Sequence, residues 1–453
     1  MDSATRGQTT HVVALPYPGQ GHINPMMNLC NLLVSQKPDI LITVVLTEEW
    51  LGLIGSEAKP DNIRFATIPN VIPSEKVRAD DMDAFFQGVM TKMEAPFERL
   101  LDLLKLPPTV IVVDTFLNWA IGVGNRRNVQ TASFWPMSAS HFTTYLHFHL
   151  FAQNGHFPID LSVKGNERVD YIPGVSSTGF IDLTTFVDGR KSNMLGHVLK
   201  AFSWVPKAQY LLVTTISELE SQVLDVLRSE LSLPIYTIGP LIPSFKAVNP
   251  VGTNHLQWLD SQPCSSVLYV SMGSYLSVSS AQMDEIAAGL HKSGVRFFWV
   301  ARSEANRLQD ICGDMGLVVP WCDQLRVLCH SSIGGFWSHC GWNSVREAVF
   351  AGVPLLTFPI NFDQGMNSKL VVEDWKIGWR VKSTEAKIDH LVTREEVAGL
   401  VKKFMDLEDD QGKEMRRRAR ELQQIWQGAI AEGGSSKTNI NAFVKGIWQD
   451  QED

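Results

Sequence analysis

Residues 321–364 decide the fold, and they read WCDQLRVLCHSSIGGFWSHCGWNSVREAVFAGVPLLTFPINFDQ. Two apolar runs predict strands over Gly335–Trp337 and Leu355–Phe358, and the helical spacing between them predicts a helix over Asn343–Phe350. A glycine-containing turn joins the first strand to the helix. A strand, a tight turn, a helix and a second strand form the repeating unit of α/β proteins with a parallel sheet.

The same alternation continues outward from this block. The second half of the chain begins with predicted strands over Val267–Ser271 and Phe297–Ala301. The N-terminal half carries five more, over His11–Leu15, Ile42–Leu46, Ile63–Ile68, Val110–Val113 and Thr131–Phe134. Further helices are predicted over Asn24–Gln36, Ala84–Leu104, Asn118–Arg127, Ser138–Gln153, Ala281–Ser293, Gln364–Glu373 and Arg394–Met405. Between the two halves, Ile238–Thr253 is rich in proline and glycine and reads as a linker.

The sequence therefore predicts an α/β chain with two Rossmann-like domains that face each other across a cleft. The expected division is an N-terminal domain over 1–243, a linker over 244–254 and a C-terminal domain over 255–432. A last helix, Thr438–Trp448 within 433–453, is expected to return to the N-terminal domain. Ligands of open parallel sheets bind at the carboxyl ends of the strands, so candidate functional residues are sought there.

Composition excludes several classes of protein. The chain has 453 residues, 44% of them hydrophobic and 19% charged, which is ample for large cores and unlike a disordered chain. The net charge of -8 argues against binding to nucleic acid or to anionic membranes. No apolar run is long enough for a membrane span, the first residues carry no secretory signal, and six cysteines are too few for a disulfide scaffold. We expect a cytoplasmic protein.

The block at 321–364 holds the parts of a site for a sugar-bearing nucleoside diphosphate. The turn before the predicted helix leaves free backbone N–H groups, and the helix dipole favours an anion there. His339, Asn343 and Ser344 add side-chain donors, and Glu347 lies one turn later on the same face. Three more residues complete the set: Trp321 as an aromatic plate, and Asp363 and Gln364 just past a strand.

The N-terminal half offers a base and a partner for it. His22 lies in a loop with two glycines, Gly19 and Gly21, directly after the first strand, and Pro25 suits the start of a helix. Asp114 ends a strand of β-branched residues at the same sheet edge. The two side chains together make a general base and its orienting carboxylate plausible. The alternatives are a surface histidine and a carboxylate that caps the next helix.

Three rival interpretations stay weak. A nicotinamide-dependent oxidoreductase would need a third glycine in the first loop, where Asn24 stands. A zinc site would use the crowded Cys312, Cys322, Cys329, His330, His339 and Cys340, which lack metal-ligand spacing. Asp81 and Asp83 are spaced like the acidic pair of metal-dependent sugar transferases, but helix capping explains them better.

The block at 321–364 resembles the signature box of plant secondary-product UDP-glycosyltransferases, glycosyltransferase family 1, and the resemblance extends over the whole chain. The matching positions of the box are Trp321, Gln324, His339, Gly341, Trp342, Asn343, Ser344, Glu347, Asp363 and Gln364. The resemblance implies the two-domain GT-B fold, with an acceptor-binding N-terminal domain and a UDP-sugar-binding C-terminal domain. It also implies inverting transfer from a UDP-sugar without metal.

The resemblance further implies a role for each matching residue. Trp321 would stack on uracil, the Cys322 backbone would pair with the base edge, and Gln324 and Glu347 would hold the ribose. The diphosphate would be held by Ser274, His339, the Trp342 backbone, Asn343 and Ser344. Asp363 and Gln364 would hold the sugar, and a glutamine at the last position goes with glucose in that family. His22 would be the catalytic base and Asp114 its partner.

Some residues depart from the family pattern, and others have two possible explanations. Cys322 and Asp323 replace the commoner Ala-Pro, Arg346 is unusually large for its position, and the segment Ser303–Gly316 looks short. Candidate walls of an acceptor pocket are Phe85, Phe116, Trp119, Phe142 and Tyr145. For each of these side chains, ordinary core packing is an equally good explanation.

The sequence thus predicts transfer of glucose from UDP-glucose to a hydroxyl or carboxyl of a small hydrophobic metabolite, giving a β-glucoside. The expected enzyme is a monomer with no cofactor and no metal, and its partners are the sugar nucleotide and the acceptor. The alternatives are a catalytically inactive UDP-sugar-binding protein and a nicotinamide-dependent oxidoreductase.

Overall fold

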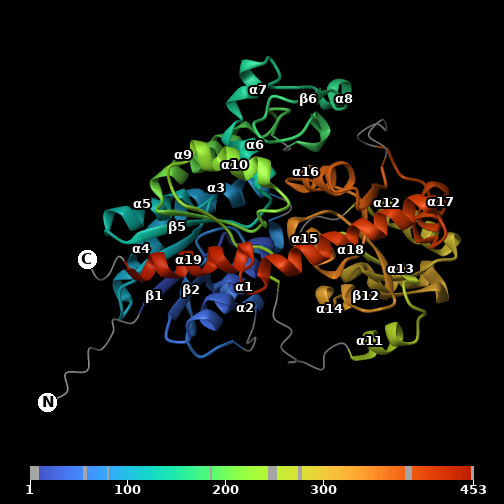
Figure 1. Cartoon of the computed structure of the whole chain (residues 1–453), viewed down its shortest axis with the longest axis horizontal. Helices are drawn as coiled ribbons and strands as arrows, with labels where there is room; N and C mark the ends of the chain where they lie inside the picture. The colour runs from blue at the N-terminus through green and yellow to red at the C-terminus, as the bar shows by residue number, and fades with distance from the viewer. Residues whose placement is uncertain are drawn as a thin grey trace. The chain divides into compact units, whose positions relative to one another are not determined.

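The computed structural model describes residues 10–54, 59–78, 81–183, 186–242, 253–273, 278–382 and 390–449. Contacts group the chain into two compact units. The first comprises Met1–Phe148, Arg190–Ile242 and Ile430–Asp453, and the second comprises His149–Gly189 and Pro243–Ala429. Each unit is built on one large parallel sheet (Figure 1).

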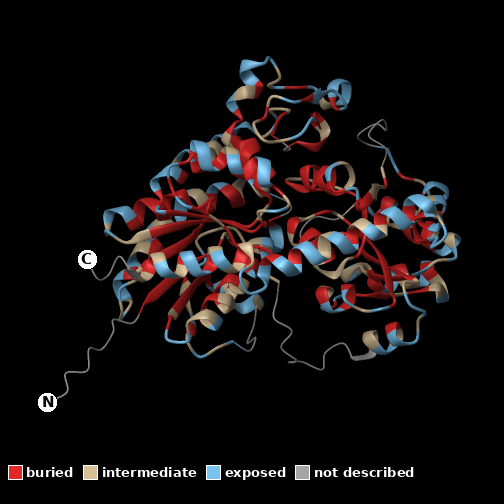
Figure 2. Ribbon diagram, viewed as in Figure 1, coloured by how far each residue is buried: buried red, intermediate tan, exposed pale blue. Residues whose placement is uncertain are grey.

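The sheet of the first unit has seven strands in the order β3-β2-β1-β4-β5-β8-β9, and all its pairs are parallel. The strands are β1 His11–Leu15, β2 Leu41–Thr47, β3 Ile63–Ile68, β4 Val110–Asp114, β5 Gln130–Trp135, β8 Tyr210–Val213 and β9 Ile235–Thr237. Strands β1 and β4 are buried along their whole length, and Figure 2 shows buried residues along the strands of this sheet. The order of strands reverses between these two, so the loops that follow them diverge.

Helices cover both faces of this sheet. One face packs against α1 Gln20–Gln36, α2 Glu48–Ile54 and α19 Ser435–Gln449 in a single hydrophobic cluster. The other face is covered by α3 Met82–Lys92, α4 Glu94–Leu103, α5 Asn118–Arg126, α6 Ala139–Leu146, α9 Ser192–Trp204 and α10 Ser221–Glu230 (Figure 1). Fully buried side chains on both faces of the strands are what a parallel sheet between two helix layers requires.

Helix α19 belongs to the core of the first unit. Ile440, Phe443 and Ile447 are buried against the sheet, and the Phe443 ring lies 5.5 Å from that of Tyr210. Asn439 Nδ2 donates to Thr237 Oγ1 at 2.7 Å, which ties the helix to β9. The i, i+3, i+7 spacing of the apolar residues makes the buried stripe.

The second unit repeats the same plan with six parallel strands in the order β12-β11-β10-β13-β14-β15. The strands are β10 Val267–Ser271, β11 Arg296–Val300, β12 Gly316–Val319, β13 Ile333–Ser338, β14 Leu355–Thr357 and β15 Gly378–Arg380. Its helices include α11 Thr253–Asp260, α12 Ser280–Ser293, α13 Ala305–Cys312, α14 Gln324–Leu328, α15 Trp342–Ala351, α16 Gln364–Lys369, α17 Arg394–Met405 and α18 Asp410–Ile430. The strand order reverses here between β10 and β13.

Residues 149–189 form a strap that is grouped with the second unit, whereas the sequence-based division placed them in the N-terminal domain. The strap carries α7 His149–Gln153, α8 Leu161–Lys164, β6 Arg168–Val169 and β7 Thr178–Gly179. Buried Asp182 makes a bidentate pair with Arg380 at 2.6 and 2.8 Å, and Arg168 pairs with Glu373 at 2.7 Å. These partners lie about 200 residues apart in the chain, so no local pattern could indicate the pairing.

Several predicted boundaries were wrong for identifiable reasons. The helix predicted over Ala84–Leu104 is two helices, because in a continuous helix the Pro96 ring would clash with the Lys92 carbonyl. Helix α1 starts at Gln20 rather than Asn24, so Pro25 lies inside its second turn. The region 138–153 is also two helices, and the predicted linker lies mainly outside the described residues, with its last two positions already in α11.

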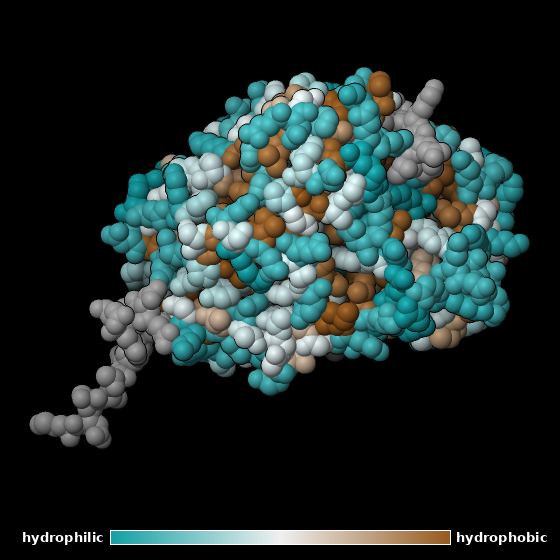
Figure 3. Space-filling view, turned by 45° about the horizontal axis from the view of Figure 1, so that its top comes forward, coloured by the Kyte–Doolittle hydropathy of each residue, from teal (hydrophilic) through white to brown (hydrophobic). Residues whose placement is uncertain are grey.

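The surface seen in Figure 3 is mostly hydrophilic, with hydrophobic side chains in separate patches. Among the described helices, none has the length and apolar character needed to cross a membrane.

Replacing Phe443 by alanine should lower the free energy of unfolding by about 3 to 5 kcal/mol, because it leaves a cavity where a fully buried ring packs on the sheet. Chemical denaturation measures the change. Lys445→Ala, on the exposed side of the same helix, is the control and should change stability little. Equal stability of the two variants would show that α19 is not part of the core.

Acid should destabilise the protein partly through His141. This side chain is buried and stacked on Trp135, and burial lowers its pKa to about 3. The folded state keeps the imidazole neutral, whereas the unfolded chain takes up a proton below a pKa near 6.5. The contribution of His141 to the free energy of unfolding is therefore complete above about pH 6.5, and it is lost at about 1.4 kcal/mol per pH unit as the pH falls toward 3.

His141→Phe should therefore reduce the loss of unfolding free energy between pH 7 and pH 4.5 by about 2 to 3 kcal/mol. Denaturant titrations at the two pH values measure it. An unchanged loss in the variant would contradict the assignment.

Candidate functional site

A histidine–aspartate pair lies at the reversal point of the first sheet. Helix α1 follows β1 after a short loop and has Gly19 as its N-cap. The Gly19 carbonyl accepts the first hydrogen bond of the helix, from His22 N at 2.9 Å. Strand β4 is the neighbour of β1 and ends at Asp114. His22 Nδ1 and Asp114 Oδ2 are 2.7 Å apart, so the predicted base and its predicted partner lie in direct contact.

The aspartate holds the histidine in one orientation. Asp114 is completely buried, and its second oxygen, Oδ1, accepts from Phe116 N at 3.1 Å. It does not cap the next helix, because α5 has Leu117 at its N-cap. With Nδ1 donating to Asp114, His22 Nε2 is left as the proton acceptor, and the side chain stays 20% exposed.

Aromatic rings surround His22. The ring of Tyr17 lies 5.1 Å from the imidazole and that of Phe116 lies 6.0 Å from it. Phe85 lies behind Tyr17, at 6.4 Å. Sequence reasoning named Phe116 and Phe85 but not Tyr17, although Tyr17 lies two positions past β1 at the same sheet edge.

The other predicted pocket walls lie deeper. Trp119 Nε1 donates to the Val89 carbonyl at 3.2 Å, and its ring packs on Phe97. Phe142 and Tyr145 are buried against Trp135 and Phe202, as expected of core side chains.

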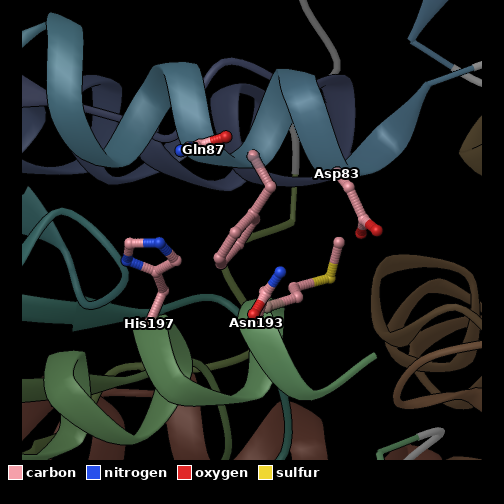
Figure 4. A pocket seen from close by; sticks show the side chains of 6 residues that line it. Asp83, Gln87, Asn193 and His197 are labelled. Carbon is pink, nitrogen blue, oxygen red and sulfur yellow. The ribbon is translucent and has the colours of Figure 1, made fainter. Parts of the chain in front are cut away.

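A groove of about 330 Å³ lies between α3 and α9 of the first unit (Figure 4). Its lining residues are Asp83, Phe86, Gln87, Asn193, Met194 and His197. The neighbouring Asp81 is the N-cap of α3 and accepts from Ala84 N at 2.9 Å, which confirms the capping interpretation for that residue. The pattern Asp83, Phe86, Gln87 at i, i+3 and i+4 puts these three on one helix face.

In the second unit, helix α15 starts shortly after β13 ends. Its N-cap is Gly341, which has no side chain that could cap the helix. His339 follows β13, and its ring lies between Gly273 and Gly341: a Cβ at either glycine would come within 2.6 Å of His339 Nε2. The two glycines therefore make room for the ring at the reversal point between β10 and β13.

The His339 side chain is partly buried, and its imidazole is neutral at physiological pH. Burial lowers its pKa to about 4, and among the described residues its Nδ1 has no hydrogen-bond partner. A buried polar atom without a partner is uncommon and suggests a ligand-facing role.

Gln324, Ser344 and Glu347 form one connected group. Gln324 Nε2 donates to Ser344 Oγ at 3.1 Å and to Glu347 Oε2 at 2.9 Å, while its Oε1 accepts from Tyr269 Oη at 3.1 Å. Burial raises the pKa of Glu347 to about 7. Nearby in sequence, Trp321 is 59% exposed, which is unusual for tryptophan and fits a side chain that stacks on a ligand.

Asp363 and Gln364 begin α16 after β14. Asp363 Oδ2 accepts from Asn367 Nδ2 at 2.7 Å, and Gln364 Oε1 accepts from the backbone N–H groups of Ile360 and Asn361 at 2.8 and 2.9 Å. The oxygen of the Gln364 amide is thus committed to the loop before it. Its Nε2 donates to no partner in the described part of the chain.

The remaining residues of the box have clear positions. Trp342 is buried beside Trp375, and Asn343 Oδ1 accepts from the guanidinium of Arg346, whose pKa burial lowers to about 10. Burial raises the pKa of the Cys322 thiol to about 12. Ser274 lies outside the described residues. Among those described, no three His, Cys, Asp or Glu side chains are grouped as metal ligands would be.

Comparison with known proteins gives these features a context. Residues 242–398 match the family described as UDP-glucoronosyl and UDP-glucosyl transferase. The chain is 50% identical to UDP-glycosyltransferase 87A2 of Arabidopsis thaliana, over 97% of both chains. It is also 50% identical to UDP-glycosyltransferase 87A1 of the same plant, over 96% of this chain and 99% of the relative.

Solved structures agree. UGT71G1 of Medicago truncatula, solved with UDP-glucose, superposes with a TM-score of 0.84 at 25% identity, over 98% of this chain and 99% of that one. Os79 of O. sativa, solved with U2F and trichothecene, gives a TM-score of 0.83 at 30% identity, over 96% of this chain and 100% of that one. The fold is therefore the GT-B fold, and the chain is a member of the plant family 1 UDP-glycosyltransferases.

Proposed function

We propose that this glycosyltransferase moves glucose from UDP-glucose to a hydroxyl or carboxyl group of a small hydrophobic molecule, with inversion at the anomeric carbon. The observation that carries the proposal is the 2.7 Å contact between His22 Nδ1 and buried Asp114. A protein that only bound the sugar nucleotide would have no use for a base held in this way. In this proposal, 1–243 binds the acceptor and 255–432 binds the donor.

His22 is the general base of the proposed reaction. An alcohol is a weak nucleophile, so its proton must leave as the oxygen attacks the anomeric carbon. His22 Nε2 takes that proton, and the carboxylate of Asp114 stabilises the imidazolium that forms. Attack from the face opposite to UDP turns the α-linked donor into a β-glucoside.

The departing diphosphate gains negative charge, and the second unit supplies donors for it. The N-terminus of α15, which has a glycine as its N-cap, presents the positive end of the helix dipole to the diphosphate. His339, Asn343 and Ser344 lie around that point, and Ser274 is proposed as a further contact. Donors fixed in advance stabilise a leaving group without a metal ion, so the proposed reaction needs none.

The proposed nucleoside contacts follow the same logic. Exposed Trp321 stacks on uracil beside the Cys322 backbone, and the Gln324–Glu347 pair accepts the ribose hydroxyls. Asp363 and Gln364 meet the sugar. UDP-glucose is the donor named for the Medicago structure, and a glutamine at 364 supports the same donor here. The six cysteines, all free thiols, support a cytoplasmic location.

His22→Ala should lower kcat by about 10²- to 10⁴-fold, because the acceptor loses its base. Asp114→Asn should also lower kcat, since an amide cannot stabilise the imidazolium. Affinity for UDP, measured by calorimetry, should stay the same in both variants. His149→Ala, an exposed histidine outside both sites, is the control. Full turnover of His22→Ala on an alcohol acceptor would refute the proposed base.

UDP-glucose should exceed UDP-galactose in kcat/KM by about tenfold or more, because a site built for an equatorial hydroxyl leaves its own polar groups unpaired when that hydroxyl is axial. Gln364→Glu keeps oxygens for the Ile360 and Asn361 N–H groups but removes the Nε2 donor. It should cut transfer from UDP-glucose while sparing UDP affinity.

Steady-state kinetics with both donors, and calorimetry with UDP, make the measurement. Gln427→Ala on the exposed side of α18 serves as the matched control. Equal kcat/KM for the two donors in the unmodified enzyme would show that Gln364 does not read the sugar.

A further inference from the structure

The groove between α3 and α9 has a composition that selects its occupant. Asp83 and Gln87 come from α3, Asn193 and His197 come from α9, and their side chains lie between the two helices (Figure 4). Phe86 and Met194, both buried, supply the apolar part of its lining. A volume of about 330 Å³ accommodates one aromatic ring with its substituent and some water.

One ring links this groove to the proposed base. The Phe86 ring lies 6.1 Å from Tyr17, 6.2 Å from Phe116 and 6.2 Å from His197. Tyr17 and Phe116 both lie beside His22. Phe86 therefore borders the aromatic surroundings of His22 with one part of its surface and lines the groove with another.

The charge of the lining favours one kind of polar group. Asp83 is a carboxylate, Gln87 and Asn193 are neutral amides, and the described residues that line the groove include neither lysine nor arginine. A carboxylate accepts hydrogen bonds strongly from a hydroxyl and repels another carboxylate. A methyl group placed there would leave the polar side chains without the water they had bonded.

We propose that the preferred acceptor is an elongated, neutral aromatic molecule with a hydroxyl at each end, an inference that rests on the proposed function. One hydroxyl meets His22 Nε2 and receives the glucose, the apolar body lies along Tyr17, Phe86 and Phe116, and the far hydroxyl donates to Asp83 in the groove. The groove thus makes the rate of transfer depend on the chemical group at the unreactive end of the acceptor.

A set of matched biphenyls tests this. 4,4′-Dihydroxybiphenyl, 4-hydroxy-4′-methylbiphenyl and 4′-hydroxybiphenyl-4-carboxylate differ only at the far end. With UDP-glucose as donor, kcat/KM for glucosylation of the phenol should be about tenfold higher for the diol than for the other two, beyond the twofold statistical advantage of its two equivalent hydroxyls. Transfer to 4-methylphenol, which has no second ring, tests the proposed function by itself.

Asp83→Asn replaces the charged carboxylate by a neutral amide of the same shape at an exposed position of α3. It should lower kcat/KM for the diol and raise it for the carboxylate, so that the preference between them falls by about tenfold. His197→Leu makes the lining of the groove less polar, so it should reduce the difference in kcat/KM between the diol and the methyl compound. Asp39→Asn, an exposed carboxylate of the same unit outside the groove, should leave all three values unchanged.

The outcomes separate the two claims. Equal kcat/KM for the three biphenyls, with ready transfer to 4-methylphenol, would overturn the role of the groove and leave the proposed function standing. An unchanged preference in Asp83→Asn would do the same. Absence of transfer from UDP-glucose to every acceptor, with UDP still bound, would overturn the proposed function itself.

Discussion

The reversal of strand order in each sheet is the constraint on which the rest of the structure depends. Between β1 and β4, and again between β10 and β13, the connections leave toward opposite faces of the sheet, so the carboxyl ends of the two strands stay accessible. His22 and Asp114 occupy that point in the first unit. His339 and its two flanking glycines occupy it in the second. One topological rule thus positions both candidate sites.

The two histidines at these equivalent points have different surroundings. His22 is partly exposed and donates to a buried carboxylate, which fixes the orientation of its ring and leaves Nε2 as a proton acceptor. His339 is enclosed by Gly273 and Gly341, and desolvation holds its pKa near 4, so that it stays neutral at physiological pH. The environment of His22 suits proton transfer. The environment of His339 suits hydrogen bonding to an anion without any transfer of a proton.

Features with a local cause could be predicted from the sequence, and features with a distant cause could not. Strands β1, β3 and β10 have the predicted bounds because their apolar runs are short and end abruptly. That His22 and Asp114 lie close together could be predicted, because each follows or ends a strand at the same edge of the sheet. By contrast, α9 was not predicted, so Asn193 and His197 were not sought, and Phe86 was not among the candidate pocket walls. The bonds from Ile360 and Asn361 that commit the Gln364 oxygen depend on a loop conformation that composition does not specify.

The strap at 149–189 has a consequence for the history and engineering of the chain. The backbone passes from one unit to the other at four places, after Phe148, Gly189, Ile242 and Ala429, rather than once at the linker. A chimera that exchanged everything after the linker would confront Asp182 with a foreign partner in place of Arg380, and would replace α19 in the core of the first unit. Exchange of the whole first unit between relatives therefore requires its three segments to travel together, and exchange of the second requires its two, so recombination at the linker alone divides both units.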